Sequence, residues 1–248
     1  MHRFFVTTNS IDQDRITLSG DVARQICVVL KISDGDSIIV LDGLGWEYTV
    51  LVESVSVSLV SGRVTNKILS IGEPNIDITL YQSVLKGDKF EYVLQKGTEL
   101  GVSEFVPVFC TRSIPKSSGK DWVTQRFKRW QKIILEAAEQ SHRGKVPVLR
   151  TPIDFEHVCK NVDGLVLIPW EEEKGTGFKE TLLVSKNGSM PKIGVIIGPE
   201  GGFTSEEIQI AVSNGIIPVS LGKRIFRADT AAMVAISAIL YEFEEFGI

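Results

Sequence analysis

The amino-acid sequence predicts an α/β protein, in which a mostly parallel sheet with flanking helices follows a smaller β-rich segment. From residue 76 onward, short apolar runs alternate with amphipathic helical patterns, which favours parallel strands joined by helices. Before residue 72, short strand-like runs lie between glycine and aspartate turns. Gly72-Glu73-Pro74-Asn75 separates the two patterns. The chain of 248 residues is long enough for two small domains, which we predict at 1–72 and 73–248.

The first 72 residues have the pattern of a small β-barrel or sandwich. Partial alternation of apolar and polar residues predicts short strands at 2–7, 37–41, 46–51, 55–60 and 63–70. The segment 21–30 predicts a short helix, because its apolar residues fall on one side. Acidic residues outnumber basic ones here, so the charge does not indicate a nucleic-acid partner, and a scaffolding role stays open.

The second domain alternates strands and helices. Apolar runs predict buried strands at 77–84, 104–109, 164–169, 193–197 and 216–221. Apolar residues at helical spacing predict helices at 88–100, 121–142, 178–184, 204–213 and 230–246. Gly101 is placed to end the first of these helices in a left-handed cap. Trp130 lies on the apolar stripe of the 121–142 helix, so we predict that it packs in the core.

A glycine-rich loop, Gly198-Pro199-Glu200-Gly201-Gly202, follows the strand 193–197, and Thr204 and Glu207 then have the spacing of a capping box. This order of strand, loop and helix often binds phosphate. Here the carboxylates of Glu200, Glu206 and Glu207 oppose a phosphate, and neither a Walker A lysine nor G-x-G-x-x-G spacing is present. The loop suits a ligand without phosphate that backbone groups recognise, although a plain tight turn explains the glycines equally well.

A second unusual loop, Leu221 to Ala228, follows the strand 216–221. Arg224 and Arg227 flank the apolar pair Ile225-Phe226, and Asp229 is placed to cap the following helix. Small residues at the start of that helix allow a ligand to approach closely, or simply allow close helix packing. Together with the loop after 164–169, three post-strand loops would share one sheet edge, where open α/β sheets bind ligands.

Basic residues concentrate in one part of an otherwise acidic chain. The formal net charge is −4, but residues 112–150 contain ten basic and three acidic residues, a local charge of +7 that leaves −11 elsewhere. Such a patch is a candidate footprint for a polyanion, whereas the commoner alternative is a solvated helix face. Arg143 has a third alternative, a helix C-terminal cap. The candidate RNA-binding residues are Arg112, Lys116, Lys120, Arg126, Arg129, Lys132 and Arg143.

Several classes of protein are excluded or disfavoured by composition. No apolar stretch reaches the roughly 18 residues of a membrane span, and the N-terminus has no signal-peptide pattern. The three cysteines are far apart, which favours a reduced, cytoplasmic compartment. The three histidines have no metal-ligand spacing, so we expect no metal and no membrane partner.

Four blocks of the sequence resemble one known family and occur in that family's order: K-G-T-E-L-G-V (96–102), E-A-A-E-Q-S-H-R-G-K-V-P (136–147), I-G-P-E-G-G-F (197–203) and L-G-K-R-I-F-R-A-D-T-A-A (221–232). They are similar to the signature blocks of the RsmE family of ribosomal RNA small-subunit methyltransferases, in the SPOUT superfamily. The resemblance spans nearly the whole chain. It implies a SPOUT-type knotted, mostly parallel sheet with flanking helices, after an N-terminal PUA-like β-barrel that contacts RNA.

The resemblance also implies an activity, the S-adenosylmethionine-dependent methylation of N3 of one uridine in small-subunit (16S) ribosomal RNA. The substrate would be that RNA or the assembled small subunit, and the enzyme would be a homodimer. Arg227, Arg224 and Arg143 are the candidate catalytic residues. The implied cofactor-binding residues are Ile168, Gly198, Pro199, Glu200, Gly201, Gly202, Leu221, Gly222, Ile225, Arg227, Thr230 and Ala231.

Two other functions stay open on the residues alone. A non-catalytic RNA-binding or ribosome-associated module would use the basic helix without a cofactor. An enzyme acting on nucleotide phosphates is disfavoured by the three carboxylates around the glycine loop.

Overall fold

The computed structural model describes residues 1–114, 119–186 and 192–247. The chain divides into two compact units, one made of Met1–Glu73 with Ala138–Val146 and the other of Pro74–Ala137 with Pro147–Ile248. The segment 138–146, which the sequence analysis places in the second domain, therefore groups with the first unit. No local pattern predicts this return, because it depends on contacts between residues far apart in the sequence.

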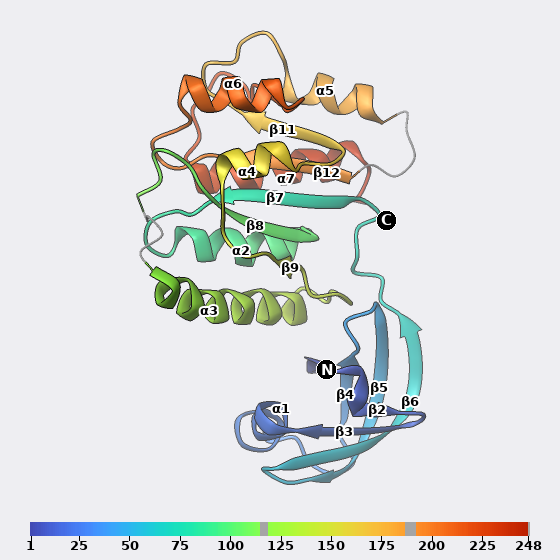
Figure 1. The fold of residues 1–248 in the computed structure, drawn as a ribbon. Helices are drawn as coiled ribbons and strands as arrows, with labels where there is room; N and C mark the ends of the chain where they lie inside the picture. Colours follow the sequence, from blue (N-terminus) through green and yellow to red (C-terminus); the bar gives the residue numbers. More distant parts are fainter. Residues whose placement is uncertain (115–118, 187–191, 248) are drawn as a thin grey trace. The chain divides into compact units, whose positions relative to one another are not determined.

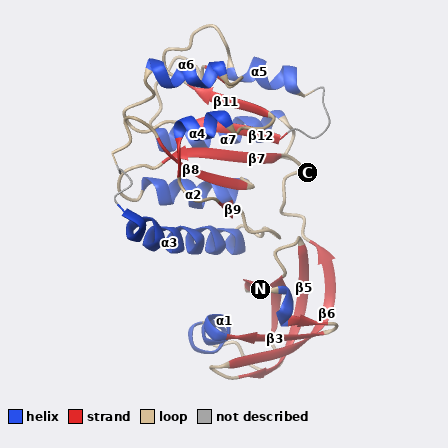
Figure 2. Cartoon of the chain, in the orientation of Figure 1, coloured by secondary structure: helices blue, strands red, loops and turns tan. Residues whose placement is uncertain are grey.

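The first unit is built on a six-stranded sheet with the order β1-β4-β5-β6-β3-β2 (Figures 1 and 2). β1 pairs with β4 in parallel and the other neighbours are antiparallel. No pairing among the described residues joins β1 to β2, so the sheet is open along its hydrogen bonds. The strands are β1 (Arg3–Phe5), β2 (Ile11–Asp12), β3 (Arg15–Ser19), β4 (Ser37–Leu41), β5 (Trp46–Val55) and β6 (Leu59–Leu69).

The alternation of β3 explains how this sheet builds its core. Ile16 and Leu18 are buried while their neighbours in the strand are exposed, the pattern of a sheet with one covered face. The cover includes α1 (Gly20–Arg24) and the π-helical turn η2 (Gln25–Val29), where the sequence predicts one helix at 21–30. The sequence analysis missed β2, which has only two residues, and also β3, although Arg15–Ser19 alternates polar and apolar residues.

Glu73 fastens the returning segment 138–146 to the first unit. Its Oε1 accepts hydrogen bonds from the backbone N–H groups of Gly144 and Lys145, both at 3.0 Å, and its Oε2 accepts one from Arg143 at 2.8 Å. His142 adopts a left-handed backbone conformation with φ of 62° at this turn. One carboxylate thus holds three consecutive residues of the turn.

The second unit contains a sheet in which all pairings between described strands are parallel, as the alternation of strands and helices predicts. Its order is β10-β8-β7-β12-β11-β13, with β9 also paired to β8. The two-residue strands β9 and β10 carry no detectable period and were not predicted. The strands are β7 (Asp77–Ser83), β8 (Glu104–Phe109), β9 (Val148–Leu149), β10 (Ile153–Asp154), β11 (Leu165–Pro169), β12 (Lys192–Ile197) and β13 (Ile217–Val219).

Helices cover both faces of this sheet (Figure 1). α4 and α6 bury apolar side chains against Val166, Ile168 and Ile196, whereas α7 packs on β7 and β12 and also contacts α2 and α5. No helix among the residues described has the length and apolar character to cross a membrane. The helices are α2 (Lys89–Leu100), α3 (Gly119–Gln140), α4 (Phe155–Lys160), α5 (Phe178–Ser185), α6 (Ser205–Ser213) and α7 (Ala228–Glu242).

Two local predictions about the helices are confirmed. Gly101 ends α2 in a left-handed conformation, with φ of 109°. Trp130 is fully buried, and its ring centroid lies 4.5 Å from that of Phe90 of α2. α3 therefore packs through its apolar stripe, which leaves Arg129 and Lys132 on its exposed side.

The capping box of α6 is also confirmed, and its glutamate has a second role. Thr204 Oγ1 accepts a hydrogen bond from the Glu207 N–H at 3.2 Å, and Glu207 Oε2 accepts one from the Thr204 N–H at 2.9 Å. Glu207 Oε1 also accepts a bond from the Thr111 N–H at 2.8 Å. The helix start is thereby tied to the loop after β8.

Candidate functional site

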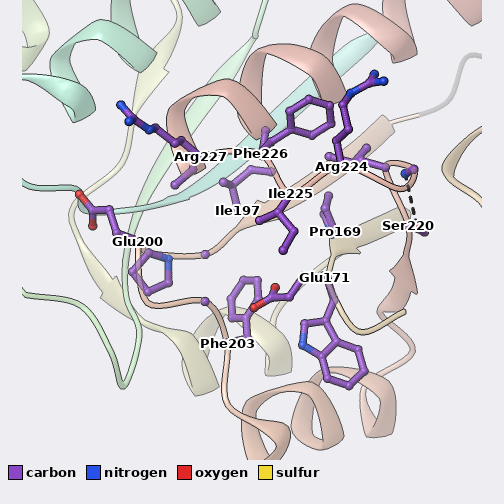
Figure 3. A pocket seen from close by; sticks show the side chains of 18 of the residues that line it. Pro169, Glu171, Ile197, Glu200, Phe203, Ser220, Arg224, Ile225, Phe226 and Arg227 are labelled. Carbon is purple, nitrogen blue, oxygen red and sulfur yellow. Dashed lines mark hydrogen bonds between the residues drawn. The ribbon is translucent and has the colours of Figure 1, made fainter. Parts of the chain in front are cut away.

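A pocket of about 310 Å³ lies at the carboxyl ends of β11, β12 and β13 (Figure 3). β11 pairs in parallel with β12 on one side and with β13 on the other, so the three strands end at the same sheet edge. Residues of all three post-strand loops line the pocket, together with Lys89 of α2 and Ala231 of α7. The sequence analysis predicted this convergence.

Backbone hydrogen bonds hold two of the loops together. Trp170 N–H donates to the Val219 carbonyl at 3.0 Å, which joins the end of β11 to the end of β13. Ser220 N–H donates to the Thr176 carbonyl at 2.9 Å, and Phe178 N–H donates to the Ser220 carbonyl at 3.2 Å. Because these bonds involve main-chain atoms, the pocket walls are positioned independently of most side-chain identities.

The glycine loop needs two of its glycines for different reasons. Gly202 has φ of 68°, a conformation that favours glycine, and its N–H closes a turn onto the Pro199 carbonyl at 3.0 Å. At Gly198, an added Cβ would lie 2.9 Å from the ring of Phe203, which is itself buried. The loop is therefore more than a plain turn: it packs its own aromatic residue beneath the backbone that lines the pocket.

Arg112 supports the same loop from outside. Its Nη1 donates to the Gly201 carbonyl at 2.9 Å and to the Phe203 carbonyl at 3.2 Å. Arg112 was a candidate RNA contact, and the structure instead gives its guanidinium two partners within the chain.

The loop after β13 places two cations on different sides of the pocket. Gly222 has φ of 105°, and its N–H donates to Ser220 Oγ at 3.3 Å. The Arg224 guanidinium lies 5.8 Å from the Phe226 ring centroid, whereas Arg227 lies on the side of Glu200 (Figure 3). Ile225 is 86% exposed at the pocket, which is unusual for an apolar side chain of this size.

The predicted cap of α7 is wrong. The helix begins at Ala228, two residues earlier than expected, with Arg227 in the N-cap position and no side-chain cap. Asp229 lies in the first turn, where a carboxylate also interacts favourably with the helix dipole. Its Oδ1 is buried without a hydrogen-bond partner.

Most of the predicted cofactor residues line this pocket. Three do not: Ile168 is fully buried within β11, Gly201 points out of the pocket toward Arg112, and Thr230 is exposed on α7. Those that do are Gly198, Pro199, Glu200, Gly202, Leu221, Gly222, Ile225, Arg227 and Ala231, and the candidate catalytic residue Arg224 joins them.

Sequence reasoning missed several lining residues. Trp170 and Glu171 directly follow the predicted strand 164–169, and Phe203 directly follows the glycine loop. All three could have been predicted, because ligands of open α/β sheets bind beside the loops that follow the strands. Lys89 had no such signal, because it belongs to α2, which precedes these strands by about 75 residues or more.

The structure buries Arg143, which was a candidate both for catalysis and for RNA contact. Its side chain is 3% exposed, and it is ion-paired with Glu73 in the first unit at 2.8 Å. Arg143 is absent from the residues lining the pocket, all of which belong to the second unit. The ion pair with Glu73 is a contact that the sequence analysis did not predict for Arg143.

The other candidate RNA-binding residues have mixed surroundings. Arg129 pairs with Glu91 at 2.6 Å yet keeps a 65% exposed side chain, and Lys132 pairs with Glu136 at 3.7 Å. Arg126 and Arg129 line a small polar hollow with the start of α2. Lys116 lies outside the described residues, and the side chain of Lys120 does too.

Other kinds of chemistry find little support in the described residues. Burial raises the pKa of Cys110 to about 12 and that of Cys159 to about 11, so both stay protonated near neutral pH and are poor nucleophiles. No group of three or more histidine, cysteine, aspartate or glutamate side chains is arranged to hold a metal in the part of the chain that the structure describes.

Comparison with known proteins identifies the class and then the family. A family model described as RNA methyltransferase domain matches residues 72–240, so the chain belongs to the class of RNA methyltransferases. The chain is also 32% identical over 252 residues to ribosomal RNA small subunit methyltransferase E of Bacillus subtilis, with 98% of each protein covered. The chain belongs to the ribosomal RNA small subunit methyltransferase E family, which confirms the resemblance found in the sequence.

Two solved structures are similar along nearly the whole chain. Ribosomal RNA small subunit methyltransferase E of Neisseria gonorrhoeae, bound to S-adenosylmethionine, has a TM-score of 0.86 and 29% identity, with 97% of each chain covered. A methyltransferase of Legionella pneumophila in complex with the same cofactor has a TM-score of 0.86 and 30% identity, with 96% of each chain covered. These likenesses confirm the α/β fold with a mostly parallel sheet and flanking helices.

The packing of the glycine loop yields a stability prediction. Gly198→Ala should lower the free energy of unfolding by about 1–3 kcal/mol, because its Cβ overpacks the buried ring of Phe203. Gly175→Ala is the matched control, since its Cβ meets only the carboxylate end of the Glu173 side chain, at an ordinary contact distance of 3.4 Å. Urea unfolding of both variants and of Gly198→Ala/Phe203→Leu provides the measurement. Equal costs for the two alanines, with no recovery in the double variant, would contradict the packing argument.

Proposed function

We propose that this protein transfers a methyl group from S-adenosylmethionine to N3 of a uridine in small-subunit ribosomal RNA. The observation that carries the proposal is the pocket built from three post-strand loops, in a chain of this family. The Bacillus subtilis relative is named as a small-subunit ribosomal RNA methyltransferase, and the Neisseria and Legionella structures hold S-adenosylmethionine. The choice of N3 and of uridine rests on the family resemblance alone.

The residues of the pocket fit this cofactor. The volume of about 310 Å³ is at the lower end of the range for small-molecule pockets, roughly 300–1,000 Å³. Apolar walls at Leu221, Ile225 and Phe226 suit a flat nucleoside, and the carboxylates of Glu171 and Glu200 suit a ligand with positive charge and no phosphate. Backbone groups of the loops supply the remaining donors and acceptors.

Each of the nine predicted lining residues is proposed to contact the cofactor. Ile168, Gly201 and Thr230 are proposed to act only indirectly. Ile168 packs in the core beneath the loop, and the Gly201 carbonyl accepts a hydrogen bond from Arg112. Thr230 is exposed on α7.

When bound, S-adenosylmethionine supplies an electrophilic methyl group. The chain positions the acceptor and stabilises the negative charge that develops on the uracil as its N3–H proton leaves. Arg227 and Arg224 line the pocket from one loop and are proposed for this stabilisation, in the manner of an oxyanion hole. Rigid loops also hold the reacting groups in line, which contributes much of the rate.

The RNA is proposed to contact the second unit along α3. Arg126, Arg129 and Lys132 lie away from the buried stripe of this helix, in a chain segment with a strong local excess of positive charge. Lys116 and Lys120 belong to the same proposal on sequence grounds. The first unit is proposed to be a PUA-like barrel that also contacts RNA, and its mostly antiparallel six-stranded sheet supports this.

Three further features are proposed from the family. The sheet of the second unit is proposed to be knotted in the SPOUT manner, which the return of β13 to the far side of β11 supports. A homodimer is proposed through α7 and the residues that follow it, where Tyr241 and Phe246 are 75% and 52% exposed. A cytoplasmic location follows from the proposed ribosomal substrate.

A non-catalytic RNA-binding module is the alternative function. It would bind RNA equally well without cofactor and would not need the pocket. The built pocket and the cofactor-bound relatives favour the enzyme.

Filling the pocket tests cofactor binding directly. Ala231→Leu should weaken S-adenosylmethionine binding at least ten-fold, or about 1.4 kcal/mol, because leucine occupies pocket volume at the start of α7. Calorimetric titration of the wild type should give about one site per subunit. Thr230→Leu is the control, since Thr230 is adjacent, exposed and outside the lining. No binding by folded wild-type protein would put the RNA-binding module first.

Removing a pocket cation tests the proposed charge stabilisation. Arg227→Ala should lower kcat by about 10²-fold, the scale expected for one preorganised donor, and should also weaken cofactor binding, because Arg227 is proposed to contact the cofactor. Lys223→Ala is the control, because Lys223 is exposed in the same loop and does not line the pocket. Methylation of small subunits from cells that lack the enzyme is the assay. Full activity of Arg227→Ala with unchanged cofactor affinity would remove Arg227 from the mechanism.

The salt dependence of binding tests the RNA contact along α3. Arg126→Ala and Lys132→Ala should each reduce the slope of log affinity against log salt by about 1, since each removes one phosphate contact. Lys179→Ala, an exposed lysine on α5, should leave the slope unchanged. Filter binding between about 50 and 200 mM salt gives the slopes. Unchanged slopes for both α3 variants would show that this face is merely solvated.

A further inference from the structure

We propose that Lys89, the first residue of α2, is a further catalytic residue, whose ammonium binds one carbonyl oxygen of the target uracil as its ring becomes an anion. The proposal rests on the proposed function. It adds to the site a residue from outside the three post-strand loops, and neither the resemblance nor the sequence pattern pointed to it.

The position of Lys89 is fixed by contacts with the glycine loop. Lys89 lines the same pocket as Glu200 and Arg227, and its Nζ lies 3.6 Å from Glu200 Oε1. The same carboxylate oxygen accepts the Lys86 N–H at 3.1 Å. The Lys89 and Glu200 side chains are 41% and 23% exposed. The ammonium is therefore held at the rim of the pocket, where the uracil of the RNA would enter.

Helix stability does not explain a lysine at this position. The first turn of a helix is its positive end, where a cation is unfavourable and a carboxylate is favourable. Asp88 and Glu91 already provide carboxylates there. They line a separate hollow with Arg126 and Arg129, and Glu91 is paired with Arg129 at 2.6 Å. The partly exposed pair with Glu200 adds little stability.

The reaction requires positive charge at this rim. The N3–H bond of the uracil breaks and its proton passes to water. The electron pair of N3 then forms the bond to the methyl carbon, and the electron pair of the methyl–sulfur bond stays on the cofactor's sulfur. Until that bond forms, negative charge is shared by N3 and the two flanking carbonyl oxygens. Among the lining residues that are described there is no histidine, so stabilising this anion falls to cations.

The cations of the pocket are placed differently. Arg227 and Glu200 lie on one side of it, whereas Arg224 is stacked near Phe226 on the other (Figure 3). Lys89, held by Glu200, is on the side of Arg227. A lysine ammonium is a compact point charge suited to one oxygen, whereas the planar arginine fork suits two. We therefore assign one carbonyl oxygen to Lys89 and leave the other to Arg227. The carboxylate facing Lys89 is that of Glu200, which orients the ammonium.

A backbone phosphate of the RNA offers the same anionic oxygen chemistry, and kinetics distinguish the two sources. A phosphate contact acts on binding, so its loss raises KM and reduces the salt dependence. A contact to the uracil anion acts on kcat and on the pH at which the base loses its proton.

The experiment compares Lys89→Met, Lys89→Arg and Lys86→Met with the wild type. Lys86 is exposed and contacts Glu200 only through its backbone, so Lys86→Met is a matched control. Cofactor affinity is measured by calorimetry and folding by thermal unfolding. kcat and KM are measured from about pH 6.5 to 9 on small subunits that lack the methyl group.

Lys89→Met should lose about 10²-fold in kcat at pH 7, while its cofactor affinity stays within about three-fold of the wild type. Lys89 favours the uracil anion, so its loss raises the pKa of the bound base. The rising limb of the plot of kcat against pH then moves to higher pH. The difference in kcat between Lys89→Met and the wild type therefore shrinks as pH increases. Lys89→Arg should recover part of the rate, and Lys86→Met should match the wild type.

Three results would overturn the assignment: an unchanged kcat, a change confined to KM and its salt dependence, or a loss of kcat with an unshifted profile and no recovery in Lys89→Arg. Loss of cofactor affinity in Lys89→Met would also overturn it, since Lys89 would then belong to the cofactor's contacts. If Lys89→Met does not fold, Lys89→Gln takes its place with the same expected outcomes. A wild-type protein that binds cofactor and transfers no methyl group would instead refute the proposed function.

Discussion

Parallel pairing of β11 with β12 on one side and β13 on the other is the constraint on which the site depends. Because strands of one direction end at one edge, this pairing brings together loops that are separated by tens of residues in the chain. Main-chain hydrogen bonds from Trp170 and Ser220 then lock the loop ends to one another. The pocket walls are thus an outcome of sheet topology, and the side chains that face the ligand are carried on backbone whose position is already determined.

The glycine loop shows how one short segment satisfies packing and recognition together. Gly198 leaves room for the buried ring of Phe203, and Gly202 provides the left-handed turn that closes onto Pro199. The loop after β8 holds this region at two points, because Arg112 donates to the Gly201 carbonyl and the Thr111 N–H donates to Glu207 of α6. The carboxylates that argue against phosphate are consistent with a cofactor that carries positive charge. The same carboxylates position basic partners, as Glu200 does for Lys89.

Charge in this protein is organised locally, although the chain as a whole is acidic. The basic segment around α3 divides its residues among three tasks: Arg112 supports a loop, Arg143 is buried against Glu73, and the exposed side of α3 keeps the remaining cations. A count of charges along the sequence treats these residues alike. Only burial and partner geometry separate a structural arginine from one that is available to RNA.

The sequence by itself determined features that depend on neighbouring residues. The Gly101 cap, the Thr204–Glu207 capping box, the buried face of α3 with Trp130 and most strands of the second unit follow from local propensity and periodicity. The sequence pattern also predicted that three post-strand loops meet at one sheet edge, and nine of the twelve residues that the family resemblance implied line the pocket there. The tertiary structure alone decided the pairing of Arg143 with Glu73, the return of 138–146 to the first unit and the presence of Lys89 in the pocket. These depend on contacts between residues from about 70 to more than 110 positions apart. The short strands β9 and β10 likewise form by pairing with β8, which lies more than 40 positions earlier in the chain. Periodicity carries no information about such contacts, since it reports which face of an element is buried and not what covers it.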